Sequence, residues 1–579
     1  MMKIACKLVL AFLLALPFAA GAAQPADLIL TNARIYTVEK DKPWAEALAV
    51  RGDRIVAIGT AKQMEAYRGP HTRILNAKQH LVLPGFTDSH IHFMDGSLSL
   101  MRVNVEDTKD LAGIQKMVKE FADAHPNAPW VLGRGWSYAE FGNRTLPDKK
   151  DLDAIVPDRP VFLEGYDGHT YWANSKALQL AGVNKDTPNP PNGEIVRDPA
   201  TGEPTGALKE DAAAALFDKV IPKPTDAERL EALRRGMALA NENGLTRVVS
   251  CGGDFENLNY YDQLRRAGQL TLRMDAARII DPAEPTAKAI DEIKSALKTY
   301  HDIWLDAGYA KFFLDGVVES HTAAMLTPYA DDPSLKGKLF WDPEKYKQAV
   351  QQLAADHIQV FTHAIGDGAV RLALDAYESA NAADKTPDAR ERIEHIETIT
   401  AEDIPRFGKL GVIASFQPLH AYPDSDTLDV WLKNAGRQRE PRAWAWQSIA
   451  KTGGHEAFGS DWPVVTLNPW QAVQTALTRQ TREGTPPGGW VPEQRLSLEQ
   501  AIAGYTLGAA YAIHRENEEG SLKPGNLADF IVLSQDLFKI DPHQVSGTKV
   551  LLTAVGGKSV YESPAWLKMQ SPGTKAGAK

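Results

Sequence analysis

Six side chains that can bind a metal ion or move a proton stand at widely separated points of the chain. Each comes at the end of an apolar, strand-like run: His90, His92, Lys311, His363, His395 and Asp461. A parallel (β/α)8 barrel presents its catalytic groups at the carboxyl ends of its strands. The sequence therefore predicts that these six side chains meet in one metal site at the mouth of such a barrel.

The four histidines of this set differ in how strongly each one indicates a metal ligand. Residues i and i+2 of a strand point to the same side, so His90 and His92 in PGFTDSHIHF can reach one ion. An isolated His-x-His pair could also be two core histidines, but this pair closes a strand-like run after a Pro-Gly turn. His363 in VFTHA and His395 in RIEH end two successive runs. We interpret all four as metal ligands.

Lys311 and Asp461 carry the less common chemistry. Lys311 lies in the apolar segment AKFFLDG, where an unpaired ammonium is costly to bury. It could extend to the surface, or react with CO2 to give an anionic carbamate that bridges two cations; we favour the carbamate. Asp461 in FGSDWP follows the last expected strand, where a carboxylate can bind metal and also accept a proton from water.

Strand-like and helix-like segments alternate between residues 84 and 514, which is typical of parallel α/β proteins. Three helices have clear start signals at Thr225, Asp342 and Ser497. We expect eight barrel strands, which end at or near His92, Cys251, Arg278, Lys311, His363, His395, Gln417 and Asp461. The predicted fold class is therefore α/β, with a TIM-like (β/α)8 barrel.

The barrel accounts for only part of the chain. About 150 residues separate His92 from the next expected strand, far more than one helix needs. We predict an inserted subdomain over 98–224, within a barrel made of 84–97 and 225–514. Short strands at both chain ends predict a composite β-sandwich of 24–83 and 515–568, and 569–579 is expected to be a disordered tail.

Composition and the N-terminus set the cellular context. The formal net charge is −10 and there is no basic run, so nucleic-acid binding has no electrostatic support. Residues 1–23 combine two lysines, a short apolar stretch and small residues, as in a cleaved signal peptide. We expect a periplasmic or secreted protein without a membrane anchor. Only Cys251 would remain, so no internal disulfide can form.

Many collinear segments resemble the amidohydrolase superfamily, and more narrowly its YtcJ-like branch (amidohydrolase family 3). They include PGFTDSHIH, GRGWS, DGHTYWANSKAL, THAIGDGA, RIEHIE, GSDWP and GSLKPGNLADFIVL, over roughly residues 27–565. The resemblance implies two divalent metal ions, with zinc expected. One would bind His90, His92, Lys311 and Asp461, and the other the Lys311 carbamate, His363 and His395.

Five further residues are expected as substrate contacts: Trp136, Asp167, His169, His321 and His420. The resemblance places all of them except His321 at the barrel mouth; His321 stands where relatives vary, and we expect it to tune the substrate pocket. Packing, a tight turn or a surface loop would also explain the first four. The expected reaction is hydrolysis of an amide, an N-acyl or N-formyl amine or a cyclic amide, with Asp461 as the catalytic base. Alternatives are an esterase, lactonase or carbamate hydrolase, a hydratase or isomerase, and a non-catalytic binding protein. The partner is a small-molecule substrate, and a homo-oligomer is compatible with the sequence.

Overall fold

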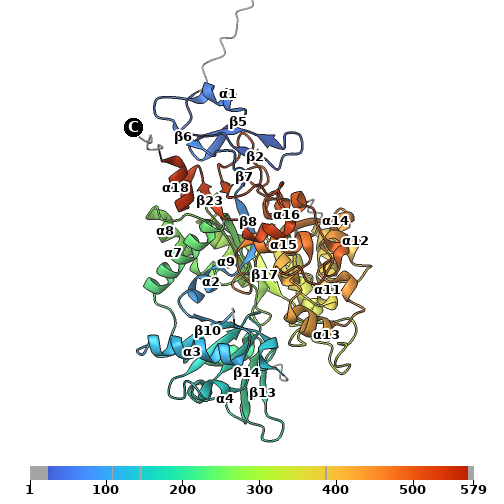
Figure 1. The fold of residues 1–579 in the computed structure, drawn as a ribbon. Coiled ribbons are helices and arrows are strands. Elements are labelled where there is room, and N and C mark those ends of the chain that lie inside the picture. Colours follow the sequence, from blue (N-terminus) through green and yellow to red (C-terminus); the bar gives the residue numbers. More distant parts are fainter. Residues whose placement is uncertain (1–23, 107, 143–145, 385–387, 572–579) are drawn as a thin grey trace, which may run out of the picture.

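The computed structural model describes residues 24–106, 108–142, 146–384 and 388–571. Within these ranges a central barrel lies between a β unit at one end and a second α/β unit at the other (Figure 1). The expected signal segment lies outside the described residues, so export stays a prediction. Most of the expected tail also lies outside them, although helix α18 (Pro564–Gln570) already includes its first positions.

The central unit is an eight-stranded parallel sheet whose order follows the chain, which confirms the predicted (β/α)8 barrel. Its strands are β8 (Phe86–Ile91), β15 (Leu245–Ser250), β16 (Arg273–Ile279), β17 (Leu305–Phe313), β18 (Gln359–Ala364), β19 (Arg392–His395), β20 (Ile413–Phe416) and β21 (His455–Phe458). Apolar side chains on both faces are buried, as expected for strands covered by helices. The first and last strands meet through backbone hydrogen bonds just beyond their carboxyl ends.

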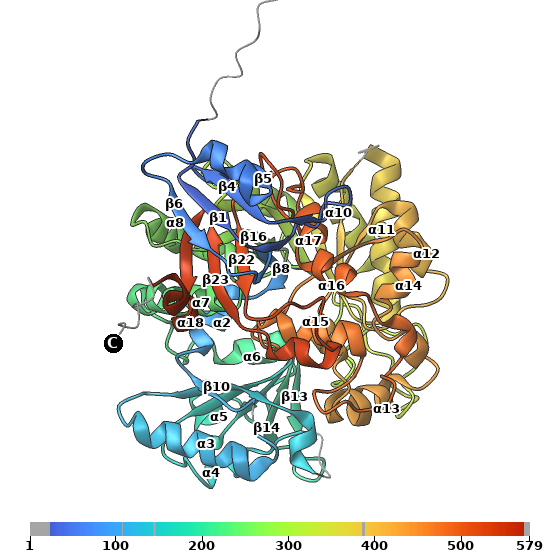
Figure 2. The same ribbon diagram turned by 45° about the horizontal axis from the view of Figure 1, so that its top comes forward.

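Helices surround this sheet (Figure 2). They are α2 (Phe93–Ser99), α7 (Asp226–Glu242), α8 (Leu258–Arg266), α9 (Thr286–Leu297), α10 (Pro343–Ala355), α11 (Asp367–Asp384), α12 (Ile404–Leu410), α14 (Trp446–Lys451), α15 (Pro469–Thr478), α16 (Leu498–Tyr505) and α17 (Leu507–Tyr511). The three predicted start signals are confirmed. Thr225 and Ser497 form capping boxes, and Asp342 caps α10 with proline at its first position.

Both chain ends contribute to the β unit. Its four-stranded sheet contains β5 (Arg54–Gly59), β4 (Ala47–Arg51), β1 (Leu28–Thr31) and β6 (Arg73–Asn76). Its six-stranded sheet contains β24 (Lys558–Glu562), β23 (Val550–Val555), β22 (Phe530–Leu533), β7 (Leu81–Pro84), β2 (Arg34–Tyr36) and β3 (Trp44–Ala45). The N-terminal β7 pairs antiparallel with the C-terminal β22, and buried side chains of both sheets form one core.

The second α/β unit interrupts the barrel between α2 and α7. Its mixed sheet has the order β13 (Glu194–Arg197), β14 (Pro204–Lys209), β12 (Thr170–Ala173), β11 (Val161–Gly165), β10 (Val131–Trp136) and β9 (Val103–Asn104). Helix α3 (Leu111–Ala124) covers it and buries Ile114, Val118 and Ala122, which recur at helical spacing. This unit extends from the carboxyl end of the barrel strands and so forms part of the wall around their mouth.

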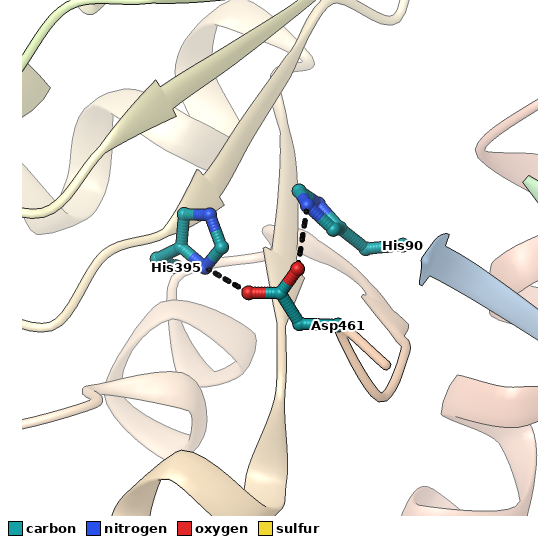
Figure 3. Close-up of side chains that lie close together, drawn as sticks. All are labelled: His90, His395 and Asp461. Carbon is teal, nitrogen blue, oxygen red and sulfur yellow. Dashed lines mark ion pairs between the residues drawn. The ribbon is translucent and has the colours of Figure 1, made fainter. Parts of the chain in front are cut away.

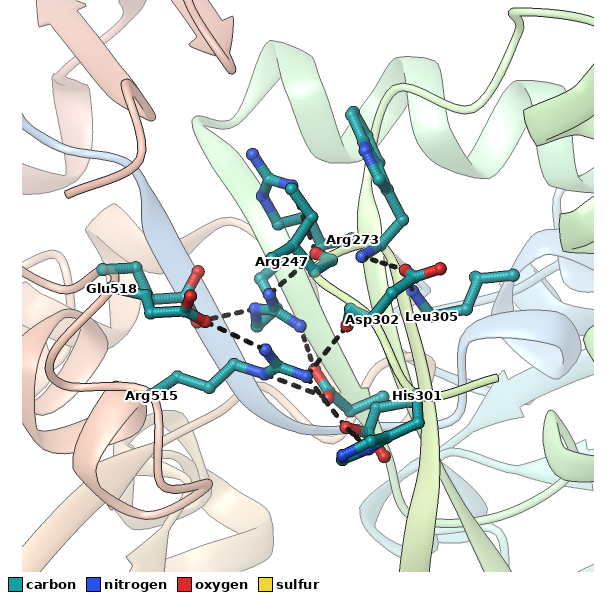
Figure 4. Close-up of polar contacts among 12 residues, drawn as sticks. Arg247, Arg273, His301, Asp302, Leu305, Arg515 and Glu518 are labelled. Atoms are coloured by element: carbon teal, nitrogen blue, oxygen red, sulfur yellow. Dashed lines mark hydrogen bonds and ion pairs between the residues drawn. The ribbon is translucent and has the colours of Figure 1, made fainter. Parts of the chain in front are cut away.

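Buried arginines join the opposite, amino end of the barrel to the C-terminal segment (Figure 4). Arg247 Nε lies 2.7 Å from Glu519 Oε1, and Arg273 Nε lies 2.7 Å from Asp529 Oδ2. Both guanidiniums are fully buried, so removing one partner would leave an uncompensated charge and cost about 3–5 kcal/mol. These ion pairs therefore fix the composite β unit against the base of the barrel.

None of the helices in the described ranges combines the length and the apolar character needed to cross a bilayer.

Candidate metal centre

The candidate site begins where the first and last barrel strands converge. The backbone N–H of Asp461 donates to the carbonyl of His90 at 2.7 Å, and that of His92 donates to Trp462 at 2.9 Å. Gly459 makes this approach sterically feasible, because a Cβ there would collide with the backbone of His90. Asp461 itself has a φ of +62°, a strained conformation for a residue other than glycine. The chain thus turns sharply and brings the carboxylate to the mouth of β8.

Asp461 is the centre of the site (Figure 3). Its Oδ1 lies 3.2 Å from His92 Nε2 and 3.4 Å from His90 Nε2. Its Oδ2 lies 3.8 Å from His395 Nδ1 and 3.7 Å from His420 Nε2. Asp461 is 5% exposed, and His90 and His395 are also buried. Four imidazoles from three separate strand ends therefore surround one carboxylate.

Lys311 and His363 complete the cluster from the neighbouring strands β17 and β18. Lys311 is fully buried, and its Nζ lies 3.5 Å from His90 Nε2. The ring of His363 lies 4.6 Å from that of His395, measured between centroids. His363 Nε2 is 3.2 Å from the carbonyl of Gly316, so donation there leaves Nδ1 free as an acceptor. The structure thus brings together all six residues that the sequence predicts as metal ligands.

Burial keeps most of these imidazoles neutral. Burial lowers the pKa of His90 to about 4, with the ammonium of Lys311 adding to the effect. Burial also lowers the pKa values of His363 and His395 well below the usual range. Burial opposes ionisation of Asp461, but His90 and the other imidazoles nevertheless hold its pKa well below the ordinary value. At neutral pH the site therefore presents unprotonated nitrogens and a carboxylate, the forms that bind divalent cations.

These donors suit a metal ion. One ligand atom each from His90, His395 and Asp461 lies within 4.8 Å of the other two. His395 Nδ1 is buried and makes no hydrogen bond to any described residue, and an unmet buried acceptor is costly unless something binds it. Nitrogen and oxygen ligands of this kind are those of zinc and other first-row divalent metals.

A buried carboxylate that sequence reasoning did not single out supports His90 from behind. Glu394 Oε2 accepts a hydrogen bond from His90 Nδ1 at 2.6 Å. Arg392 donates hydrogen bonds to the same carboxylate at 2.9 and 3.0 Å. Burial alone would raise the pKa of Glu394, but Arg392 and His90 lower it to about 2. This contact fixes the His90 tautomer, so that Nε2 faces Asp461 unprotonated. The alternation of RIEH was the available signal, because Glu394 and Arg392 share one face of the strand.

The Glu394→Gln variant is expected to bind divalent metal about 10- to 100-fold more weakly, because an amide holds His90 less firmly. Competition with a metal-binding dye would measure the loss. Glu456→Gln is the matched control. Burial raises the pKa of Glu456 to about 8, so that side chain is already neutral at pH 7. Equal metal affinity in the Glu394 and Glu456 variants would contradict the role of Glu394.

The metal cluster opens into a cavity of about 690 Å³ between the barrel mouth and the inserted unit. Three of the predicted substrate contacts, Asp167, His169 and His420, line it. His169 Nδ1 lies 2.8 Å from Glu210 Oε2. Burial alone would lower the pKa of His169, but the Glu210 carboxylate raises it to about 10. Burial instead lowers the pKa of His420. The cavity thus presents one imidazolium and one neutral imidazole next to the metal cluster.

Two other predicted contacts lie elsewhere. Trp136 is fully buried in the core of the inserted unit, where its ring packs 5.5 Å from Phe141 and 5.3 Å from Tyr138. Trp136 is not among the described residues that line the cavity, whereas its chain neighbours Gly135 and Ser137 are. Successive residues of an extended strand point to opposite sides, so Trp136 at the end of β10 faces away from the cavity. His321 also stands away from the cavity lining, with its Nε2 3.0 Å from Asp331.

The barrel and its histidine–aspartate cluster define the class of the protein, and comparison with known proteins agrees. The Amidohydrolase family model matches residues 73–561. Protein LONG AFTER FAR-RED 3 of Arabidopsis thaliana is 34% identical over 93% of this chain and 92% of its own length. The putative amidohydrolase YtcJ of Bacillus subtilis is 30% identical over 91% and 98%. The chain therefore belongs to the amidohydrolase family, and its class is that of a hydrolase.

Two more distant proteins extend the comparison. N-substituted formamide deformylase of Arthrobacter pascens is 26% identical over 93% of this chain and 99% of its own length. The crystal structure of an uncharacterized metal-dependent hydrolase from Pyrococcus horikoshii covers 89% of this chain and 99% of its own, with a TM-score of 0.70 and 24% identity. The latter likeness shows the same fold.

Proposed function

We propose that the chain hydrolyses a C–N bond in a small amide, an N-acyl or N-formyl amine or a cyclic amide. The observation that carries this proposal is the buried Asp461 carboxylate, which four imidazoles surround at the floor of an accessible cavity. The name of the related formamide deformylase supports the choice of bond.

We further propose that the six clustered residues hold two divalent ions, with zinc as the expected element. His90, His92, Lys311 and Asp461 would hold one ion, and Lys311, His363 and His395 the other. Bound divalent metal supplies Lewis acidity, which polarises a carbonyl and lowers the pKa of water to about 7.

Lys311 requires a covalent change to serve both ions. Its amine would lose a proton and form an N–C bond with CO2, which converts a buried cation into an anionic carbamate. The position of its Nζ, 3.5 Å from His90 Nε2 and in a fully buried setting, favours that conversion. An ammonium is costly to bury without a counter-charge, and no ion pair of Lys311 occurs among the described residues.

Asp461 would move the proton during the reaction. Its carboxylate is ionised at neutral pH, so it can accept the proton of the attacking water as the C–O bond forms. It would then deliver this proton to the leaving nitrogen as the C–N bond breaks. The products are a carboxylic acid and a free amine, and no redox partner is needed.

His420 and His169 would orient the substrate. His420 is neutral, and its Nε2 is buried without a hydrogen bond to any described residue, 3.7 Å from Asp461. It can therefore donate one N–H to the oxygen of the scissile carbonyl. His169 is protonated beside Glu210, so it can stabilise negative charge that develops on the side of the substrate opposite His420.

The same groups could act on an ester, a lactone or a carbamate, because these differ from an amide only in the leaving atom. A hydratase or isomerase would use the site without releasing an amine.

Matched substrates distinguish these reactions. We expect release of free amine from a set of N-formyl and N-acetyl amines, with loss of turnover after chelation and recovery with zinc. Esters with the same acyl group serve as the comparison, because an esterase would hydrolyse them and leave every amide intact. Amine formation, measured with an amine-reactive dye, would distinguish amide hydrolysis from ester hydrolysis. Ester turnover without amide turnover would contradict the proposed bond.

A further inference from the structure

The cavity above the metal centre has an unusual balance of charge. Its lining includes ten aspartates and glutamates but only two arginines, and one of these, Arg134, is already bound to Glu106. Only one of the ten carboxylates, Asp461, belongs to the metal cluster. The other nine carboxyl groups need a different explanation.

Four of these carboxylates form an inner group, which we call the carboxylate wall: Asp167, Glu319, Glu397 and Asp426. Each accepts a hydrogen bond from a neutral side-chain group. The donors are Tyr138 Oη to Asp167 at 2.6 Å, Tyr166 Oη to Glu319 at 3.5 Å, Trp431 Nε1 to Glu397 at 2.7 Å and Ser137 Oγ to Asp426 at 2.6 Å. In the part of the chain that the structure describes, no lysine or arginine forms an ion pair with any of the four.

The members of the carboxylate wall destabilise one another. Burial raises the pKa of Glu319 to about 8, and the neighbouring charge of Asp167 adds to the rise. Glu319 is therefore mostly protonated at pH 7, because burial and the negative charge of its neighbours oppose its ionisation. A cation placed among them would relieve this repulsion.

Two buried polar atoms independently indicate that the cavity is built for a ligand. Trp444 lines the cavity, is 2% exposed, and its Nε1 makes no hydrogen bond to any described residue. His420 Nε2 is similarly unpartnered. The rings of Trp444 and Trp431 lie 4.8 Å apart beside Glu397. Aromatic faces next to carboxylates are the setting in which proteins bind organic cations.

The position of the carboxylate wall relates it to the reaction. His420 Nδ1 lies 3.9 Å from Glu397 Oε1, while its Nε2 lies 3.7 Å from Asp461 Oδ2. The carboxylate wall therefore begins one imidazole ring away from the catalytic carboxylate. A substrate whose carbonyl contacts His420 would direct a short chain toward Glu397 and Glu319.

We infer that the preferred substrate is a cationic amide, such as a mono-N-acylated diamine, whose free ammonium binds between Glu319 and Glu397. This inference rests on the proposed C–N hydrolysis and adds the class of substrate. The recognised group is an alkylammonium.

Two substrates of nearly equal shape test the inference in the metal-loaded protein: mono-N-formyl-1,4-diaminobutane and N-formylpentylamine. We expect kcat/KM to be about tenfold or more higher for the cationic compound, because a charged hydrogen bond is worth at least that factor. The Glu319→Gln variant should lose most of this preference through KM, while kcat/KM for the neutral amide changes less than threefold. Glu402→Gln, at an exposed position, is the control.

Binding of 1,4-diaminobutane, measured by calorimetry, separates this inference from the proposed function. If neither amide is cleaved but the diamine binds and Glu319→Gln weakens binding about tenfold or more, the hydrolysis proposal fails and the cation site stands. If both amides are cleaved equally and the diamine does not bind, the cation inference is overturned and hydrolysis stands. A variant that weakens both substrates alike would also overturn the inference.

Discussion

Replacement of Asp461 by asparagine is expected to lower kcat for amide hydrolysis by about two to four orders of magnitude while most of the metal stays bound. The amide keeps an oxygen that can bind metal, but it cannot accept the proton of the attacking water. The carboxylate is the common neighbour of His90, His92, His395 and His420, so no other group replaces it. Steady-state kinetics and elemental analysis of the same preparation measure both quantities.

The control for this variant is Asp429→Asn, an exposed acid on the nearby segment η6 (Asp426–Trp431) that does not line the cavity. It should keep kcat within about threefold of the original value, as most surface substitutions change little. A kcat for Asp461→Asn equal to that of the control would rule out Asp461 as the catalytic base.

Lys311→Ala is expected to lose at least one equivalent of metal and about three orders of magnitude in kcat/KM, because the shared ligand of both ions is gone. The side chain is fully buried and central, so its loss leaves a space between His90 and Phe313. A short carboxylate such as propionate should partly restore activity by occupying that space.

A second measurement addresses the covalent form of Lys311. Metal-depleted protein reconstituted with zinc in CO2-free buffer should recover little activity, and added bicarbonate should restore it. Full recovery without bicarbonate would contradict the carbamate. Full metal binding by Lys311→Ala would show that Lys311 does not hold the metal in either form.

Much of the barrel could be predicted because each strand ends at a recognisable residue. The expected ends at His92, Lys311, His363 and His395 lie within two residues of the strand ends in the structure. These strands are buried on both faces, so they occur as short apolar runs broken by turn residues. The helix expected to begin at Ser497 is interrupted at Thr506, which separates α16 from α17.

The substrate side of the site was harder to predict. Asp167 and His169 line the cavity, but Trp136 in the same unit is part of its core, because neighbouring residues on a strand face opposite sides. Glu394, Glu210, Glu319 and Glu397 contribute to the site through contacts with residues far along the chain. Single-sequence patterns carry no information on such long-range pairs, so these acids could be found only in three dimensions.

Metal content per chain is the most direct test of the metal-dependent hydrolase proposed for this protein. The full-length protein, purified without chelator and from cells supplied with zinc, should contain close to two equivalents of divalent metal by elemental analysis. Removal of the metal should abolish amide hydrolysis, and its return should restore it. A content near zero, with no uptake on reconstitution, would contradict the proposed centre and favour a binding protein on the same fold.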